Sequence, residues 1–281
     1  MLFRSTKVIA GVEKKSRVVS PKERRLTAFH EAGHAVLAKL MPSTDPVHQV
    51  TIIPRGRAGG FTLQLPTEDR SYRTKSQMER ELIILLGGRI AEKLVLHDIS
   101  TGASNDLNRV TQIAKAMVTK YAMSDNLSAM SYGTEEEVFI GRDMAQMKNF
   151  SEQVQAEIDR EVRRIVDDAY ESALTLLEEN VEKLHLVAEA LLEFESLNGD
   201  EFIAAFDNGI EGVKVQREHA KHNASTTMFT GMAQADDKSA EEKSAEEVTA
   251  EEVTAEDSAP VEEPNPAEET APAEDSKKDE Q

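Results

Sequence analysis

The sequence predicts a mainly helical domain with a small β element, followed by a disordered acidic tail. Apolar residues recur at helical spacing through most of the chain before the tail. Only residues 47–53 and 61–65 are rich in β-branched residues or alternate apolar with polar residues. Nothing alternates strands with helices as a parallel sheet requires. These observations favour a mainly α fold.

The composition indicates one soluble globular domain together with a polar segment. The chain has 281 residues, of which 39% are hydrophobic, and it contains no cysteine. The lack of cysteine excludes disulfides, thiolate metal sites and cysteine nucleophiles, and it fits a reducing compartment. No run approaches 18 apolar residues, and the N-terminus lacks the apolar core of a signal peptide. We therefore expect a cytoplasmic chain that does not cross a membrane unaided.

The net charge of −19 is concentrated near the C-terminus. Residues 235–281 contain 18 acidic and 4 basic residues, a net charge of −14, which leaves −5 for the rest of the chain. We expect residues 214–281 to be a disordered tail, because the acidic repeats offer little to bury. Residues 1–19 are expected to be a linker, and residues 20–213 the folded domain. No basic patch with interleaved aromatic residues predicts nucleic-acid binding.

The first element is a helix expected to begin after Ser20 and to end before Pro42. Ser20 supplies a hydroxyl cap, Pro21 suits the first helical position, and Glu23 stands three residues after the cap. The helix carries an apolar stripe that includes two histidines: Leu26, Phe29, His30, Gly33, His34, Leu37 and Leu40. The histidines are expected to face the interior, and Gly33 to let another backbone pass close by.

The motif His30-Glu-Ala-Gly-His34 predicts a zinc site with a catalytic base. Two histidines four residues apart share one helix face, so both imidazoles reach one ion. Glu31 would stand beside the open position, where a carboxylate takes a proton from an attacking water and passes it to the leaving amine. This pattern indicates a zinc peptidase. The alternative is that both histidines are core residues with hydrogen-bond partners.

Residues 47–53 and 61–65 are expected to form two strands joined by a glycine-rich turn. The second strand is interpreted as a substrate-binding strand, which would hold an extended peptide by backbone pairing. The residues proposed to do so are Phe61, Thr62 and Leu63.

Helices account for the remaining elements. One is expected to open at a capping box formed by Ser76 and Glu79 and to continue to about residue 96. A loop of small polar residues, 98–106, leads into the next helix. A last short helix is expected to be capped by Asp200. The helical patterns after the loop cover residues 107–121, 151–179, 184–194 and 202–206.

A catalytic zinc needs a third protein ligand, and the residues alone leave two carboxylates as alternatives. The extension that would place a third histidine six residues past His34 fails, because that residue is Leu40. Asp106 ends the loop of small residues and lies in the first turn of a helix. Glu92, on the helix after Gly87-Gly88, is the competitor. Either carboxylate could instead be a helix cap or a surface charge.

Four segments resemble, in order and spacing, the peptidase domain of the FtsH family of membrane-anchored, ATP-dependent zinc metalloproteases. They are His30-Glu-Ala-Gly-His34 and residues 45–57, 87–92 and 100–106. The resemblance runs from about Val8 to near Asp207. It implies a mainly helical protease domain in a hexameric disc, which degrades unfolded or membrane proteins on the cytoplasmic side of a membrane.

The resemblance also implies roles for the competing carboxylates. Zinc would be held by His30, His34 and the aspartate matching Asp106. Glu92 would then orient a ligand without binding the metal.

The chain departs from that family in two respects. It contains neither transmembrane helices nor an AAA+ ATPase domain with a Gly-x-x-x-x-Gly-Lys-Ser/Thr phosphate loop. It is therefore expected to be a fragment, or a protease-only chain whose ATPase is another protein. Tyr121-Ala122 stands where the family has a tryptophan and a glycine.

The interpretation is a zinc endopeptidase that acts on unfolded proteins as the proteolytic part of an ATP-dependent assembly. The rival is a noncatalytic ring scaffold in which zinc is structural. The presence of Glu31 argues against the rival, since a closed structural site needs no base.

Overall fold

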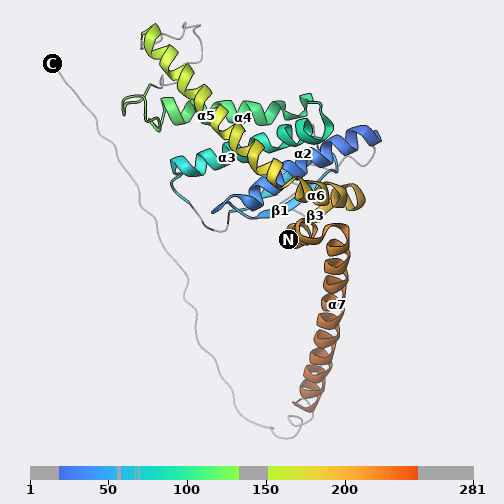
Figure 1. The fold of residues 1–281 in the computed structure, drawn as a ribbon. Coiled ribbons are helices and arrows are strands. Elements are labelled where there is room, and N and C mark those ends of the chain that lie inside the picture. The colour runs from blue at the N-terminus through green and yellow to red at the C-terminus, as the bar shows by residue number, and fades with distance from the viewer. Residues whose placement is uncertain (1–18, 56–57, 67, 69, 133–150, 246–281) are drawn as a thin grey trace, which may run out of the picture. The chain divides into compact units, whose positions relative to one another are not determined.

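A computed structural model describes residues 19–55, 58–66, 68, 70–132 and 151–245, with side chains up to residue 222 (Figure 1). The described chain is mainly helical, as predicted. Its elements in order are α2 (Pro21–Leu40), β1 (Val47–Thr51), β2 (Phe61–Gln64), α3 (Lys75–Ala91), a π-helix (Glu92–Leu96), a 3-10 helix (Thr101–Ala103), α4 (Ser104–Thr119), α5 (Glu152–Glu179), α6 (Val181–Phe194), β3 (Ser196–Asn198) and α7 (Gly199–Ala245). Among the described helices, none combines the length and the apolar character that a membrane span requires.

Helix α2 forms the centre of the domain. It begins as predicted, with the Ser20 hydroxyl accepting a hydrogen bond from the backbone N–H of Glu23 at 3.2 Å and with Pro21 at its first position. All residues from 28 to 38 are buried, because α3, α5, α6 and β1 pack around the helix. Both histidines therefore lie inside the domain, as their place in the apolar stripe predicts.

Helices α2 and α3 contact each other through glycines. A Cβ atom on Gly33 would lie 2.4 Å from the carbonyl oxygen of Gly87, and one on Gly87 would lie 2.8 Å from the carbonyl oxygen of Gly33. Any larger residue at either position would push the helices apart. The prediction that another backbone passes close to Gly33 is confirmed, and the close contact brings α3 alongside the two histidines.

The β element is a three-stranded antiparallel sheet rather than the predicted pair of strands. The strand order is β2-β1-β3, so β1 is central and β2 is an edge strand. Strand β3 has only three residues and therefore shows no alternation that sequence reasoning could detect. It is fixed by tertiary contacts, since Leu197 is fully buried and pairs with Val50.

The predicted capping box of α3 is wrong by two residues. The cap is Thr74, whose hydroxyl accepts from the backbone N–H of Gln77 at 3.3 Å, while the Gln77 side chain accepts from the backbone N–H of Thr74 at 2.9 Å. Thr74 has the extended backbone that a cap requires. Ser76 and Glu79 already lie within the helix.

Helix α5 runs across α3 and α4 in Figure 1, and it packs against both. It buries the face that its periodicity predicts, including Ile158, Ile165 and Leu177. The same helix carries Glu161, a buried carboxylate that accepts from Asn126 Nδ2 at 2.9 Å and from Arg164 Nη2 at 2.6 Å. These donors, with Arg164 foremost, lower the pKa of Glu161 to about 2 and tie the segment after α4 to α5.

The last helix differs from its prediction in its cap and its length. The Asn198 side chain accepts from the backbone N–H of Glu201 at 2.9 Å, so Asn198 and not Asp200 is the cap. Helical geometry is interrupted at Gly209, where φ is 64°. The predicted short helix corresponds to the part before Gly209, and the part after it was missed.

The acidic tail predicted from residue 214 begins within α7. Arg217 donates to Glu201 at 2.7 Å, and its guanidinium lies 4.4 Å from the centre of the Phe194 ring. The contacts of the chain divide it after Ala224. Residues 246–281, and the predicted linker up to residue 18, lie outside the described residues. The boundaries at residues 19 and 213 stay predictions.

Ala122 adopts a backbone conformation that glycine favours, with φ of 49°. Ala122→Gly is expected to raise the free energy of unfolding by about 1 kcal/mol, because a Cβ in the left-handed region is strained. Denaturant unfolding measures the change. Ala156→Gly, on the exposed face of α5, is the control and should destabilise by about 1 kcal/mol. Equal decreases in the free energy of unfolding of the two variants would contradict the prediction.

Candidate metal centre

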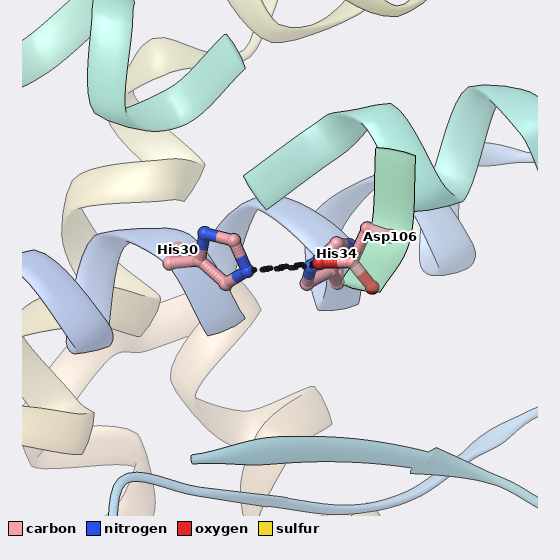
Figure 2. A group of neighbouring side chains, drawn as sticks. All are labelled: His30, His34 and Asp106. Atoms are coloured by element: carbon pink, nitrogen blue, oxygen red, sulfur yellow. Dashed lines mark hydrogen bonds and ion pairs between the residues drawn. The ribbon is translucent and has the colours of Figure 1, made fainter. Parts of the chain in front are cut away.

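Two imidazoles and a carboxylate, all groups of the kind that ligate metals, converge from two helices. Figure 2 shows His30 and His34 of α2 and Asp106 of α4 pointing toward one another. The two Nε2 atoms are 3.1 Å apart, and Asp106 Oδ2 lies 3.4 Å from Nε2 of His30 and 3.6 Å from Nε2 of His34. Among the described residues, no other group of three histidine or acidic side chains has its ligand atoms this close together.

Both histidines are held so that Nε2 faces the centre. Nδ1 of His30 donates to Glu92 Oε1 at 2.7 Å, and Nδ1 of His34 donates to the carbonyl oxygen of Ile84 at 2.8 Å. With the proton on Nδ1, a neutral imidazole keeps a free lone pair on Nε2. The hydrogen bonds therefore fix the tautomer and the ring orientation that metal binding needs.

The centre stabilises positive charge. Burial alone would lower the pKa of His30, but the carboxylates of Asp106 and Glu92 raise it to about 10. Burial alone would likewise raise the pKa of Asp106, yet its contacts with His30 and His34 hold it well below the usual range of a carboxyl group. A cation placed among the three side chains meets the same favourable field.

Glu31 lies beside the three donors without joining them. It is 6% exposed, and its Oε2 accepts a hydrogen bond from the Thr62 hydroxyl at 2.9 Å. Burial raises the pKa of Glu31, against the opposing effect of His34 and His30. A raised pKa suits a group that both takes up and releases a proton near neutral pH.

Glu92 is fully buried behind His30 and is not among the three converging donors. Besides His30, it accepts from the backbone N–H of Ser100 at 2.7 Å and from the Ser100 hydroxyl at 3.0 Å. It opens the π-helix at the end of α3, a distortion often found near functional sites. Its carboxylate thus joins the loop before Asp106 to the ring of His30, one of the three converging donors.

The three donors open onto a cleft of about 880 Å³. Edge strand β2 forms part of its wall, with Phe61, Thr62 and Gln64 lining it. Leu63, which was predicted to bind substrate with Phe61 and Thr62, is not among the lining residues. Side chains alternate along a strand, so the alternation that turns Thr62 toward the cleft also directs Gln64 rather than Leu63 toward it.

Two contributors to the centre were missed in the sequence. The Ile84 carbonyl carries no side-chain signal. Gly88 packs directly against both rings, since a Cβ there would lie 2.6 Å from Nε2 of His30 and 2.6 Å from Nε2 of His34. The glycine pair was visible in the sequence, but its position against the histidines was not.

Comparison with known families settles the relationship. Residues 17–204, more than half of the chain, match Peptidase family M41. The chain belongs to this family. The matched residues of this M41 chain include the three donors, Glu31 and Glu92.

Curated relatives extend this finding. The M41 chain is 63% identical over 206 residues to the ATP-dependent zinc metalloprotease FtsH 2 of Alkaliphilus metalliredigens, covering 73% of this chain and 30% of the relative. It is 60% identical over 211 residues to the ATP-dependent zinc metalloprotease FtsH 1 of a Thermoanaerobacter species, covering 74% and 34%. The chain therefore spans about a third of the length of these relatives.

Proposed function

We propose that this chain is a zinc-dependent endopeptidase that hydrolyses peptide bonds in unfolded polypeptides. The observation that carries the proposal is the cluster of His30, His34 and Asp106 at an open cleft, with the buried carboxylate of Glu31 beside it. The relatives are named zinc metalloproteases, which agrees with this chemistry.

The donors fit zinc in kind and in spacing. Four-coordinate zinc with nitrogen and oxygen ligands at about 2.0–2.2 Å separates neighbouring ligand atoms by about 3.3–3.6 Å. The three separations in the chain are 3.1, 3.4 and 3.6 Å. Three protein ligands leave one position of a tetrahedral site open, as in catalytic zinc sites, whereas structural sites use four protein ligands. This favours a peptidase over a ring scaffold with structural zinc.

The chain's own residues supply proton transfer and orientation. Zinc bound here would make a water molecule nucleophilic near neutral pH and polarise the substrate carbonyl. Glu31 accepts the proton on its carboxylate and delivers it to the nitrogen of the leaving amine. The Thr62 hydroxyl holds Oε2 of Glu31, and Glu92 and the Ile84 carbonyl keep the two histidine rings in place.

An extended substrate would add to the sheet at β2. In the described sheet, β2 pairs only with β1, which leaves its other edge available for a peptide. Phe61 and Thr62 lie in the cleft wall beside Glu31, and we replace Leu63 by Gln64 as the third contact.

The chain acts as the proteolytic part of a larger, ATP-dependent protease. This rests on the names of the relatives and on the third of their length that the chain spans. Following the family resemblance, the assembly is a homo-hexamer whose AAA+ ATPase domain feeds unfolded or membrane proteins to this site on the cytoplasmic side of a membrane. Residues 20–213 form the peptidase domain.

Gly88→Ala is expected to weaken zinc binding by about 10- to 100-fold, comparable to the loss of an outer hydrogen-bond partner. The added methyl group would overlap both histidine rings, which must then move apart. Competition with a chromophoric chelator measures the affinity. In the control, Gly59→Ala, the new methyl group would lie 3.3 Å from the Thr27 side chain, so zinc affinity should persist. Equal affinities in the two variants would contradict this placement of Gly88.

The purified zinc-loaded chain is expected to cleave casein without ATP and to stop when a zinc chelator is added. A stably folded protein should remain intact with or without ATP, because these 281 residues contain no phosphate-binding loop to couple ATP hydrolysis to unfolding. Gel electrophoresis of timed digests gives the result. A zinc-bound chain that leaves casein intact would favour the noncatalytic scaffold. ATP-stimulated digestion of the folded protein would contradict the proposal that a separate ATPase domain unfolds the substrates.

A further inference from the structure

One of the four arginines that line the cleft has no acidic partner among the described residues. Four arginines line the cleft: Arg70, Arg73, Arg80 and Arg109. Arg70 pairs with Asp45 at 2.9 Å, and Glu81 pairs with both Arg73 and Arg109. Exposed Glu68 lines the cleft too, without an ion pair among the described residues. Among the residues that the structure describes, two carboxylates therefore pair with three of the arginines, and none pairs with Arg80.

The guanidinium group of Arg80 has a hydrogen-bond donor without an acceptor among the described residues. Its Nε atom is shielded from solvent and has no hydrogen-bond partner among the described residues. A guanidinium group stays protonated at all ordinary pH values and presents its donors in a fixed fork that matches a carboxylate. Since buried donors are nearly always paired in native proteins, an unpaired one in a substrate cleft points to a ligand that supplies the acceptor.

The helical register places Arg80 at a defined distance from the metal centre. Gly88 touches the two histidines, Ile84 one turn earlier accepts from His34, and Arg80 lies one turn earlier still. Eight residues of helix rise about 12 Å. An extended peptide covers that distance with about four residues, at about 3.3 Å each. Because helical side chains lean toward the N-terminus, the guanidinium group lies somewhat farther from the metal.

Strand β2 leads a bound peptide toward the same part of the cleft. Its first residues lie beside Glu31, and its last residue, Gln64, donates to the carbonyl oxygen of Asp45 at 2.8 Å. Asp45 is the partner of Arg70. A peptide paired along β2 therefore extends from the metal centre toward Arg70, which lines the same cleft as Arg80.

We infer that Arg80 selects substrates that carry a glutamate or aspartate three to five residues from the cleaved bond. The inference rests on the peptidase function proposed above and names the substrate class of the same site. The carboxylate supplies the acceptor that the guanidinium lacks and forms a charged pair with it.

Fluorogenic peptides that differ only by glutamate or glutamine at one position, on either side of the cleaved bond, test the inference. The zinc-loaded chain is expected to favour glutamate by about three- to tenfold in kcat/KM at one of the positions three to five residues from the cleaved bond, a range typical of a partly buried charge pair. The side of the bond on which the preference falls tells whether the peptide runs antiparallel or parallel to β2. A preference at no such position would overturn the inference.

Variants assign the preference to Arg80. Arg80→Gln should bring the glutamate-to-glutamine ratio close to one, Arg80→Lys should keep part of it, and Arg80→Glu should favour a lysine peptide instead. Arg160→Gln is the control, since Arg160 lies exposed on α5 outside the cleft, and it should keep the full ratio. An unchanged ratio in Arg80→Gln would overturn the assignment.

A binding measurement separates this inference from the peptidase proposal. Fluorescence anisotropy gives the Kd of the same peptides for the zinc-loaded Glu31→Gln variant, with and without Arg80→Gln. If the zinc-loaded chain with Glu31 intact cleaves none of the peptides, while the glutamate-to-glutamine Kd ratio still depends on Arg80, the peptidase proposal is overturned and the carboxylate site is supported. If the chain cleaves the peptides but neither the kcat/KM ratio nor the Kd ratio depends on Arg80, the carboxylate site is overturned and the peptidase proposal stands.

Discussion

Glu31→Gln is expected to lower the rate of casein cleavage by about 10²- to 10⁴-fold, the usual contribution of a general acid and base. The amide keeps the size of the carboxylate and can still contact Thr62, but it cannot take up a proton. Zinc content should stay near that of the unchanged chain, because Glu31 is not one of the three converging donors. Metal analysis and a timed casein assay on the same sample measure both.

The control for this variant is Glu178→Gln, on the exposed side of α5, which should change neither quantity. Cleavage by Glu31→Gln at a rate close to that of Glu178→Gln would remove Glu31 from its proposed role. Loss of zinc in Glu31→Gln would mean that its carboxylate helps to hold the metal.

Asp106→Asn is expected to weaken zinc binding more strongly than Glu92→Gln. Asp106 contributes one of three ligand atoms, and an amide oxygen without charge is a weaker ligand. Glu92 orients the His30 ring without lying among the donors, so its loss should cost about 10- to 100-fold in affinity. Equilibrium titration with a competing chelator ranks the two variants.

Asp167→Asn, an exposed change on α5, serves as the control and should bind zinc like the unchanged chain. A reversed ranking, or an anomalous-scattering map with zinc bonded to Glu92 and remote from Asp106, would overturn the ligand assignment.

Local sequence signals placed the first half of the centre. The Ser20 cap and Pro21 start α2 where they were expected, and the spacing of His30 and His34 puts both rings on its buried face. Such signals act within one or two helical turns, so they can be recognised without knowing the rest of the fold. The same reasoning failed at α3, because Thr74 and Ser76 both carry a hydroxyl and only the backbone conformation distinguishes the cap.

The sequence by itself therefore determined the mainly helical class, the paired histidines with their neighbouring glutamate, and the two strands beside them. From the residues alone, the choice between Asp106 and Glu92 stayed open, and the resemblance to a family favoured Asp106. The tertiary structure brought Asp106 to the two rings and Glu92 behind one of them. It also decided the third strand, the position of Gly88 and the unpaired guanidinium of Arg80. These features depend on how α3 and α4 pack against α2, and no spacing within a single helix encodes contacts between residues more than 60 positions apart.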